Sequence, residues 1–317
     1  MTTVKDPPTT ATIRCVHGDH TVELHDREAV AQRLLAVSRK HSFNPDVDVE
    51  WHAPTDPDVF YIPPQMVSLY ETPLWDRLDH RQRVELSKHE FCSVTSLGIT
   101  AELNLMASLI RHASDISYQS SHWAYALTEV EDECRHSKMF ARMIDTFGLD
   151  IVHPGAPVRH AGRLAGLIAE PVAVFAGALL IEEFTDALQR VTFPDETLQP
   201  LARAVTRIHV IEETRHIKYA REELKRQLAQ RSPLRRHAVA YLVAQCARYI
   251  RTTVINPSCY AAVGLDPRQA GQAARASAHR RKVEQWMVSK CLAFFDEVGM
   301  LDGPARRVWT KSGLLAT

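Results

Sequence analysis

A chain of 317 residues with 45% apolar content is long enough to bury a large core, as one big helical domain or two smaller ones. Its 38 basic and 38 acidic residues cancel, which argues against nucleic acid or an anionic membrane as partner and favours a small molecule. The cysteines are scattered, the N-terminus shows no secretion signal, and the longest apolar stretch is about half of a membrane-spanning helix. We therefore expect a soluble, cytoplasmic protein.

Residues 1–74 form a predicted N-terminal segment that wraps over the rest. Thr12–Val16 and Thr21–Leu24 have the pattern of a β-hairpin. Asp26 is placed to cap a helix that runs to about His41. The following stretch is rich in proline, so we expect it to run extended as far as residue 73.

From about residue 75 onward, apolar residues recur at helical spacing through long segments. Strand patterns are confined to the N-terminus, so we predict an all-α fold in which residues 75–317 form one helical bundle domain. Glycine and proline breakers set the limits of its helices. The predicted helices cover residues 80–112, 117–147, 159–192 with Pro171 as a candidate break, 196–230, 233–254 and 267–299.

A lone glutamate followed by Glu-x-Arg-His occurs twice in the chain, and the interval between the two parts is the same both times. On a helix, Glu-x-x-His places a carboxylate and an imidazole on one face, and an inward glutamate on a neighbouring helix completes half of a bridged two-metal site in a four-helix bundle. Every position of the second set follows its counterpart by one constant offset, as duplication of a helical hairpin would produce. The two sets are Glu102 with Glu133 and His136, and Glu182 with Glu213 and His216.

Chance explains this repeat poorly. With 16 histidines in 317 residues, roughly one glutamate in twenty has a histidine three positions on by chance. Two glutamates do here, and both lie on predicted helices, follow an acidic residue and stand at the same interval after a lone glutamate. Glu102 and Glu182 lie in apolar runs, where an ionised carboxylate is costly unless it is paired or bound to metal. The adjacent Glu183 is an alternative to Glu182, and the equal spacing favours Glu182.

A further histidine, His209, lies one turn before Glu213 on the helix face that also carries His216. A lone histidine is more often a packed core residue than a ligand, but its position beside the motif favours a ligand here. Mixed nitrogen and oxygen donors without thiolate suit iron or manganese. The predicted ligands are Glu102, Glu133, His136, Glu182, His209, Glu213 and His216.

Four charged residues within the motifs are candidates for a supporting role. Asp132 and Glu212 are placed to accept the remaining N–H of a ligand histidine across the bundle. Arg135 and Arg215 are placed to neutralise buried acids there. Ordinary surface salt bridges explain these four residues equally well.

These residues resemble the ferritin-like carboxylate di-iron proteins and, more specifically, the p-aminobenzoate N-oxygenase family of bacterial natural-product pathways. The specific link is Glu182 followed by His209-x-x-x-Glu213-x-x-His216, since the extra histidine marks that family. The resemblance is good over residues 75–230. It implies a homodimeric monooxygenase with two iron ions, or manganese in one site, which uses O2 and an external ferredoxin- or reductase-type electron donor to oxidise an amine to hydroxylamine, nitroso and nitro products.

The substrate is where the chain departs from that family. Family members that act on an aromatic amino acid hold its carboxylate with an arginine from the C-terminal region. Arg275, Arg280 and Arg281 offer no single match, and the positions one to two turns from the ligands are apolar. Val94 and Leu188 are the candidate pocket residues among them. A different or more apolar substrate therefore remains open.

Three other functions compete with amine oxidation. C–H hydroxylation or desaturation of a carrier-bound or apolar substrate is the nearest, because Asp-Glu-x-Arg-His also resembles acyl-carrier-protein desaturases, although His209 argues against it. A ribonucleotide-reductase-type subunit would need a tyrosine where the chain has Phe140. Iron storage without turnover is disfavoured, since the chain is much longer than a ferritin subunit and the C-terminal helices would have no purpose.

Overall fold

The computed structural model describes residues 13–17, 20–155, 160, 164 and 169–316. Apart from one small hairpin, the regular structure within these residues is helical, and the predicted all-α class is confirmed. In the hairpin, β1 (Ile13–His17) pairs antiparallel with β2 (His20–Leu24), with Ile13 opposite Leu24. The hairpin therefore lies within one residue of its predicted strands.

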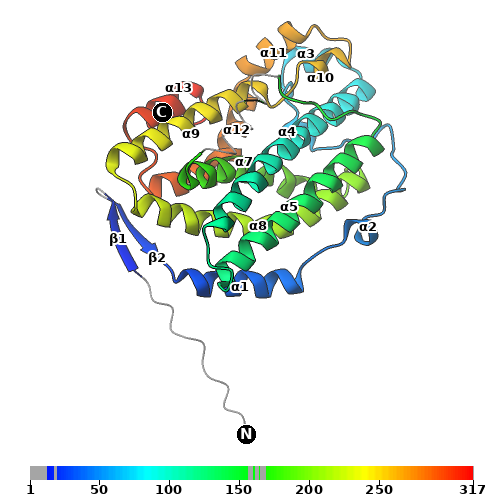
Figure 1. Ribbon diagram of the computed structural model, residues 1–317. Coiled ribbons are helices and arrows are strands. Elements are labelled where there is room, and N and C mark those ends of the chain that lie inside the picture. Colours follow the sequence, from blue (N-terminus) through cyan, green and yellow to red (C-terminus); the bar gives the residue numbers. More distant parts are fainter. Residues whose placement is uncertain (1–12, 18–19, 156–159, 161–163, 165–168, 317) are drawn as a thin grey trace.

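Four long helices form the centre of the molecule (Figure 1). α4 (His80–Ser114) packs along α5 (Ser121–Thr146), and α7 (Pro171–Thr192) packs along α8 (Pro200–Ala229). α4 also contacts α7, and α5 contacts α8, so the two hairpins close into a bundle. The four helices carry, in order, a lone glutamate, a motif, a lone glutamate and a motif.

Local signals explain where these helices begin. Asp79 and Gln82 form a reciprocal capping box at the start of α4, and the Ser120 side chain accepts from the backbone N–H of Trp123 at the start of α5. Pro171 and Pro200 occupy the first position of α7 and α8. Helix α7 thus begins at the candidate break, and most of the preceding part of the predicted helix 159–192 lies outside the described residues.

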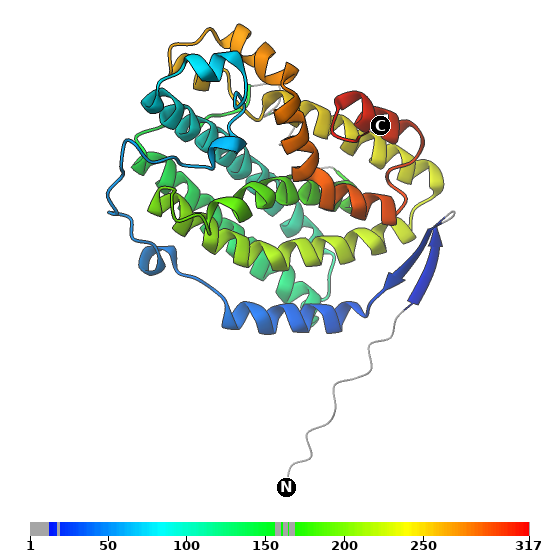
Figure 2. The same cartoon turned by 180° about the vertical axis from the view of Figure 1, so that it is seen from behind.

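Other helices cover the bundle on two sides. α1 (Arg27–Lys40), capped by Asp26, lies across α5 and α8, while α9 (Pro233–Thr253) and α12 (Ala278–Glu297) pack on α7. Figures 1 and 2 place α1 at one edge of the molecule and the C-terminal helices at the opposite edge. The bundle centre is therefore enclosed by protein on both sides.

The predicted helix 267–299 is wrong in one respect, because it is two helices. α11 (Pro267–Ala276) ends at Ser277, and α12 begins directly after it. Ser277 has an extended backbone, with φ −61° and ψ 127°, and its hydroxyl accepts from the backbone N–H of Arg280. A serine that caps a new helix therefore overrides the continuous apolar pattern.

The stretch before residue 73 is also less extended than predicted. Proline begins each short helical piece in this region, and at that position its missing N–H costs nothing because the first turn of a helix has no partner for it. The pieces are α2 (Pro45–Asp48), a 3-10 turn (Pro64–Met66) and α3 (Pro73–Arg77). In the C-terminal region, the apolar spacing likewise did not predict the short helices α10 (Ser258–Ala261) and α13 (Gly303–Ser312).

Within the described residues, α4 is the one helix long and apolar enough to cross a membrane by length and composition. However, 56% of its apolar window is buried inside the protein, and it packs on α5 and α7. We read it as a core helix of the bundle.

Candidate metal centre

All seven predicted ligands are buried in the middle of the bundle. Glu102 and Glu182 are 8% exposed, and the other five are 4% exposed or less. They come from all four central helices, so no single element builds the site. Burial of so many ionisable groups in one place is costly without a compensating charge.

Two motif glutamates lie between two motif histidines. The Nδ1 atom of His216 is 3.1 Å from the Glu133 carboxylate and 3.2 Å from that of Glu213. The Nδ1 atom of His136 is 3.4 Å and 3.3 Å from the same two carboxylates. Ligand atoms of these four residues all lie within 4.8 Å of one another, which is close enough for shared coordination of metal.

His209 extends this cluster toward α4. Its Nε2 atom is 3.3 Å from Glu213 and 3.6 Å from Glu102, and Glu102, His136 and His209 form a second group within 4.8 Å. The ring of Phe140 packs on His209 with centroids 4.7 Å apart. Position 140 therefore supplies an apolar contact at the centre rather than a phenol hydroxyl.

Each histidine is oriented by a hydrogen bond on its other nitrogen. The Nε2 atom of His136 is 2.8 Å from Glu212, and that of His216 is 3.2 Å from Asp132, so each motif supports the histidine of the other. The Nδ1 atom of His209 is 2.7 Å from the side-chain oxygen of Gln189. With these nitrogens donating outward, the inner nitrogens are left as acceptors for metal.

The two motif arginines neutralise the supporting acids. Arg215 donates to Asp132 at 3.0 Å and lies 3.7 Å from Glu212, while Arg135 contacts both carboxylates from the other side. Burial opposes ionisation of Asp132 and Glu212, but the neighbouring histidines and arginines hold the pKa of both carboxyl groups below the usual range. Both acids therefore stay ionised as acceptors.

Several buried carboxylate oxygens at the centre have no hydrogen-bond partner. These are both oxygens of Glu133, both of Glu182 and one of Glu213. Burial, reinforced by the charges of Glu213, Glu129 and Glu133, raises the pKa of Glu182 well above its ordinary value. The adjacent Glu183 instead accepts from Arg221 at 2.6 Å. Unsatisfied, mutually repelling carboxylates beside imidazole nitrogens fit a site for two divalent cations.

Sequence reasoning missed two residues beside the ligands. Gln189, which holds His209, lies two helical turns after Glu182 and shares its face, a spacing that could have indicated it. Glu129 lies one turn before Glu133, is 1% exposed, and has one carboxylate oxygen without a partner. Burial raises the pKa of Glu129 well above its usual value.

A cavity of about 330 Å³ opens onto five of the seven ligands, Glu102, Glu133, Glu182, His209 and Glu213. Its other walls come from α4, α7 and α9, with Phe140 from α5, and are mainly apolar. Val94 and Leu188 are buried but do not line this cavity; they line a separate, smaller one with Glu90 and Arg280.

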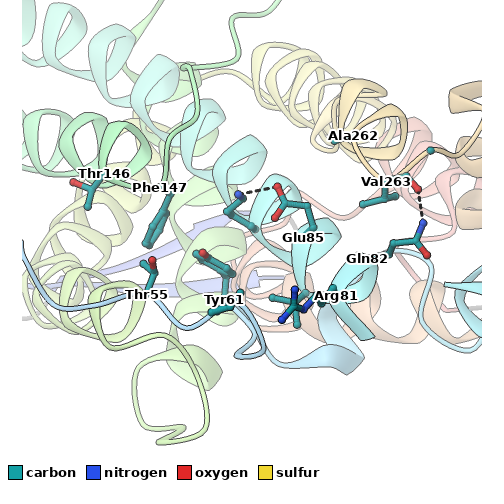
Figure 3. A pocket seen from close by; sticks show the side chains of 13 residues that line it. Thr55, Tyr61, Arg81, Gln82, Glu85, Thr146, Phe147, Ala262 and Val263 are labelled. Atoms are coloured by element: carbon teal, nitrogen blue, oxygen red, sulfur yellow. Dashed lines mark hydrogen bonds and ion pairs between the residues drawn. The ribbon is translucent and has the colours of Figure 1, made fainter. Parts of the chain in front are cut away.

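A larger cavity of about 670 Å³ lies elsewhere, between α4, the end of α5 and the segment after α10 (Figure 3). None of the predicted ligands lines it. Several of its polar side chains bond to one another or to backbone, as Lys88 does to Glu85 at 2.7 Å and Gln82 to the carbonyl of Val263 at 3.1 Å. Size alone therefore does not mark the reactive site.

Comparisons with known proteins agree with this geometry. The chain is 30% identical over 229 residues, 69% of its length, to the uncharacterized proteins MT0908 of Mycobacterium tuberculosis (strain CDC 1551 / Oshkosh) and Mb0909 of Mycobacterium bovis (strain ATCC BAA-935 / AF2122/97), covering 67% of each. The model of the p-aminobenzoate N-oxygenase AurF family, whose fold is ferritin-like and all-helical, matches residues 25–299. This match includes all seven candidate ligands, and the chain belongs to the p-aminobenzoate N-oxygenase AurF family.

Proposed function

We propose that this chain is an O2-dependent di-iron monooxygenase that oxidises an amine to hydroxylamine, nitroso or nitro products in a biosynthetic pathway. The observation that carries the proposal is His209, a third imidazole that lies beside Glu102 and Glu213 and is held by Gln189. The family match supports an oxygenase acting on nitrogen.

The donor set supports iron. Oxygen and nitrogen donors without thiolate favour iron, with manganese as an alternative in one position. Four carboxylates would balance the charge of two divalent ions, so that the occupied centre is neutral inside an apolar bundle. The carboxylates are Glu102, Glu133, Glu182 and Glu213, and the imidazoles are His136, His209 and His216.

The side chains around the ligands have distinct tasks. Asp132, Glu212 and Gln189 fix the rings of the three histidines, and Arg135 and Arg215 keep the two acids ionised. When bound, the metal pair supplies the activation of O2, which no side chain provides. The largely aliphatic cavity admits the substrate and limits the access of water.

The first step balances when one oxygen atom enters the amine and the other leaves as water, consuming two electrons and two protons. We place the source of these electrons outside the chain, in a ferredoxin- or reductase-type donor. A cytoplasmic homodimer is part of the proposal, by analogy with the family. The substrate is a small molecule, free or bound to a carrier protein.

Oxidation of C–H bonds in an apolar substrate is the second candidate, and the aliphatic walls of the cavity favour it. Iron storage is the weaker alternative, since a cavity leading to the ligands is the feature of a site that turns over a substrate.

The test is to load the full-length protein with iron, add a reductant and O2, and offer separate panels of arylamines and acyl chains. We expect arylamines to gain oxygen on nitrogen, as detected by mass spectrometry. His209→Ala should lower the rate by about 100-fold, while His237→Ala, which alters an exposed histidine, should not. Oxidised acyl chains without any oxidised arylamine would overturn the proposal.

A further inference from the structure

We infer that the cavity above the cluster selects an aromatic amine that carries no carboxylate, and that Gly98 and Gly177 set its width. This inference rests on the proposed function and names its substrate class. It differs from the chemistry of p-aminobenzoate, which combines an arylamine with an acid group.

The walls of the cavity are built from small and aliphatic side chains. α4 contributes Gly98, Ala101 and Leu105, whereas α7 contributes Gly177 and Ile181. Helix α9 closes the remaining side with Leu242, Val243 and Cys246. A volume of about 330 Å³ accommodates one substituted aromatic ring.

Gly98 and Gly177 both leave space where a side chain would otherwise project. A Cβ atom added at either position would meet no atom within 4 Å, although both residues lie inside long helices. Glycine in a helix interior costs about 1 kcal/mol relative to alanine. Two such positions on facing cavity walls are best explained by the room they leave for a ligand.

Most polar groups on the walls already make hydrogen bonds, and the side-chain oxygen of Gln189 accepts from His209, which leaves the Gln189 amide group as a donor. The hydroxyl groups of Thr95, Ser108 and Thr185 each donate to a carbonyl of their own helix, at 2.9, 2.9 and 3.0 Å. The Asn104 amide donates to Thr100 in the same way. Among the residues that the structure describes, no lysine or arginine lines the cavity.

The carboxylates that face the cavity belong to the cluster, where two divalent ions would balance them, so none of them offers a partner to a substrate carboxylate. An anionic substrate would lose its hydration without gaining a cationic partner, whereas an alkyl group would gain contact with the aliphatic walls. An aromatic amine also enters uncharged, with its nitrogen lone pair available, whereas an aliphatic amine is protonated at neutral pH, as lysine is.

The test compares two ligands that share a ring and an amine. Binding of 4-ethylaniline and 4-aminobenzoate to iron-loaded, full-length protein is measured by calorimetry without O2. We expect 4-ethylaniline to bind at least about tenfold more tightly. Gly98→Leu and Gly177→Leu should each weaken that binding at least about tenfold, while Ala107→Leu, on the exposed side of α4, should leave it unchanged.

Equal or tighter binding of 4-aminobenzoate would overturn the inference, as would tight binding of 4-ethylaniline by both leucine variants, or failure of both ligands to bind. Gly98→Ala and Gly177→Ala, which add one methyl group each, provide milder versions if a leucine variant does not fold. Admission of O2 then separates the two claims. The expected order of binding without any oxidised amine would contradict the proposed function and leave the selectivity of the cavity intact.

Discussion

The two helical hairpins of the bundle carry the same motif but differ at the position one turn before it. One constant offset in the sequence relates Glu102 to Glu182, Glu133 to Glu213 and His136 to His216. The same offset places Glu129 opposite His209. One hairpin therefore has an imidazole where the other has a carboxyl group.

This difference separates the two ends of the cluster. His209 lies beside Glu102 and stacks near His136, with ring centroids 4.6 Å apart. Glu129, with its raised pKa, acts electrostatically on Glu182 and lies near His216. The duplicated residues thus occupy equivalent positions in the two hairpins, and the departure from symmetry gives the two ends of the cluster different surroundings.

The largest effect is expected where the halves are equivalent. Glu133→Ala and Glu213→Ala should each abolish stable binding of iron and lower activity by at least about 100-fold, because both carboxylates lie between His136 and His216. Metal analysis after gel filtration checks this. Glu131→Ala, which alters an exposed residue on the same helix, is the control. Retention of two irons in either motif variant would show that the carboxylates do not bridge.

The supporting arginines should differ between the halves in their effect on stability. Arg215 has a side chain 3% exposed, and Arg215→Met leaves Asp132 and Glu212 short of a buried partner, at a cost of about 3–5 kcal/mol. Arg135 is 23% exposed, and Arg135→Met should cost about 1 kcal/mol. Urea unfolding of both variants measures this comparison. Equal losses would mean that exposure does not distinguish the two arginines.

The clustering of the seven candidate ligands could be predicted because its signals are local. Glu-x-x-His fixes two side chains on one helix face, and a constant offset relates the hairpins regardless of how they pack. Val94 and Leu188 show the limit of such reasoning, since whether a buried position faces one cavity or another depends on the contacts between helices. Ser277 shows another, because one capping hydroxyl divides an otherwise continuous helical pattern.

A smaller effect is expected from the partner of His209. Gln189→Leu removes the acceptor for the His209 ring at similar side-chain volume, and should weaken iron binding by about 10- to 100-fold while the protein stays folded. The corresponding position in the other hairpin is Leu109, so no matching partner exists there. Titration with ferrous iron in the absence of O2 provides the measurement. Unchanged affinity would argue that the orientation of His209 does not depend on Gln189.

The last effect concerns the pH dependence of stability, through Glu90 and its counterpart Glu170, which the same sequence offset relates. Burial raises the pKa of Glu90 to about 7, although hydrogen bonds from Ser68 oppose the shift. Because this pKa lies above the ordinary value of 4.5, protonated Glu90 stabilises the fold. That stabilisation is complete below pH 4.5 and is lost as the pH rises through about 7. Glu90→Gln should therefore stabilise the protein relative to wild type more at pH 8 than at pH 5.

Thermal unfolding at the two pH values measures this difference. Glu170→Gln is the matched control, since Glu170 is at the surface and pairs with Arg231 and Arg235. If the two glutamine variants change stability in parallel across this range, then Glu90 does not titrate as its burial requires.

Mössbauer spectroscopy of protein loaded with iron-57 tests the metal centre most directly. The account predicts about two irons per chain that are magnetically coupled and give two distinct signals, because His209 binds at one end of the cluster and Glu129 faces the other. His209→Ala should alter one signal and leave the other in place. A single, uncoupled iron per chain would contradict the central claim that the duplicated motifs form one dinuclear site.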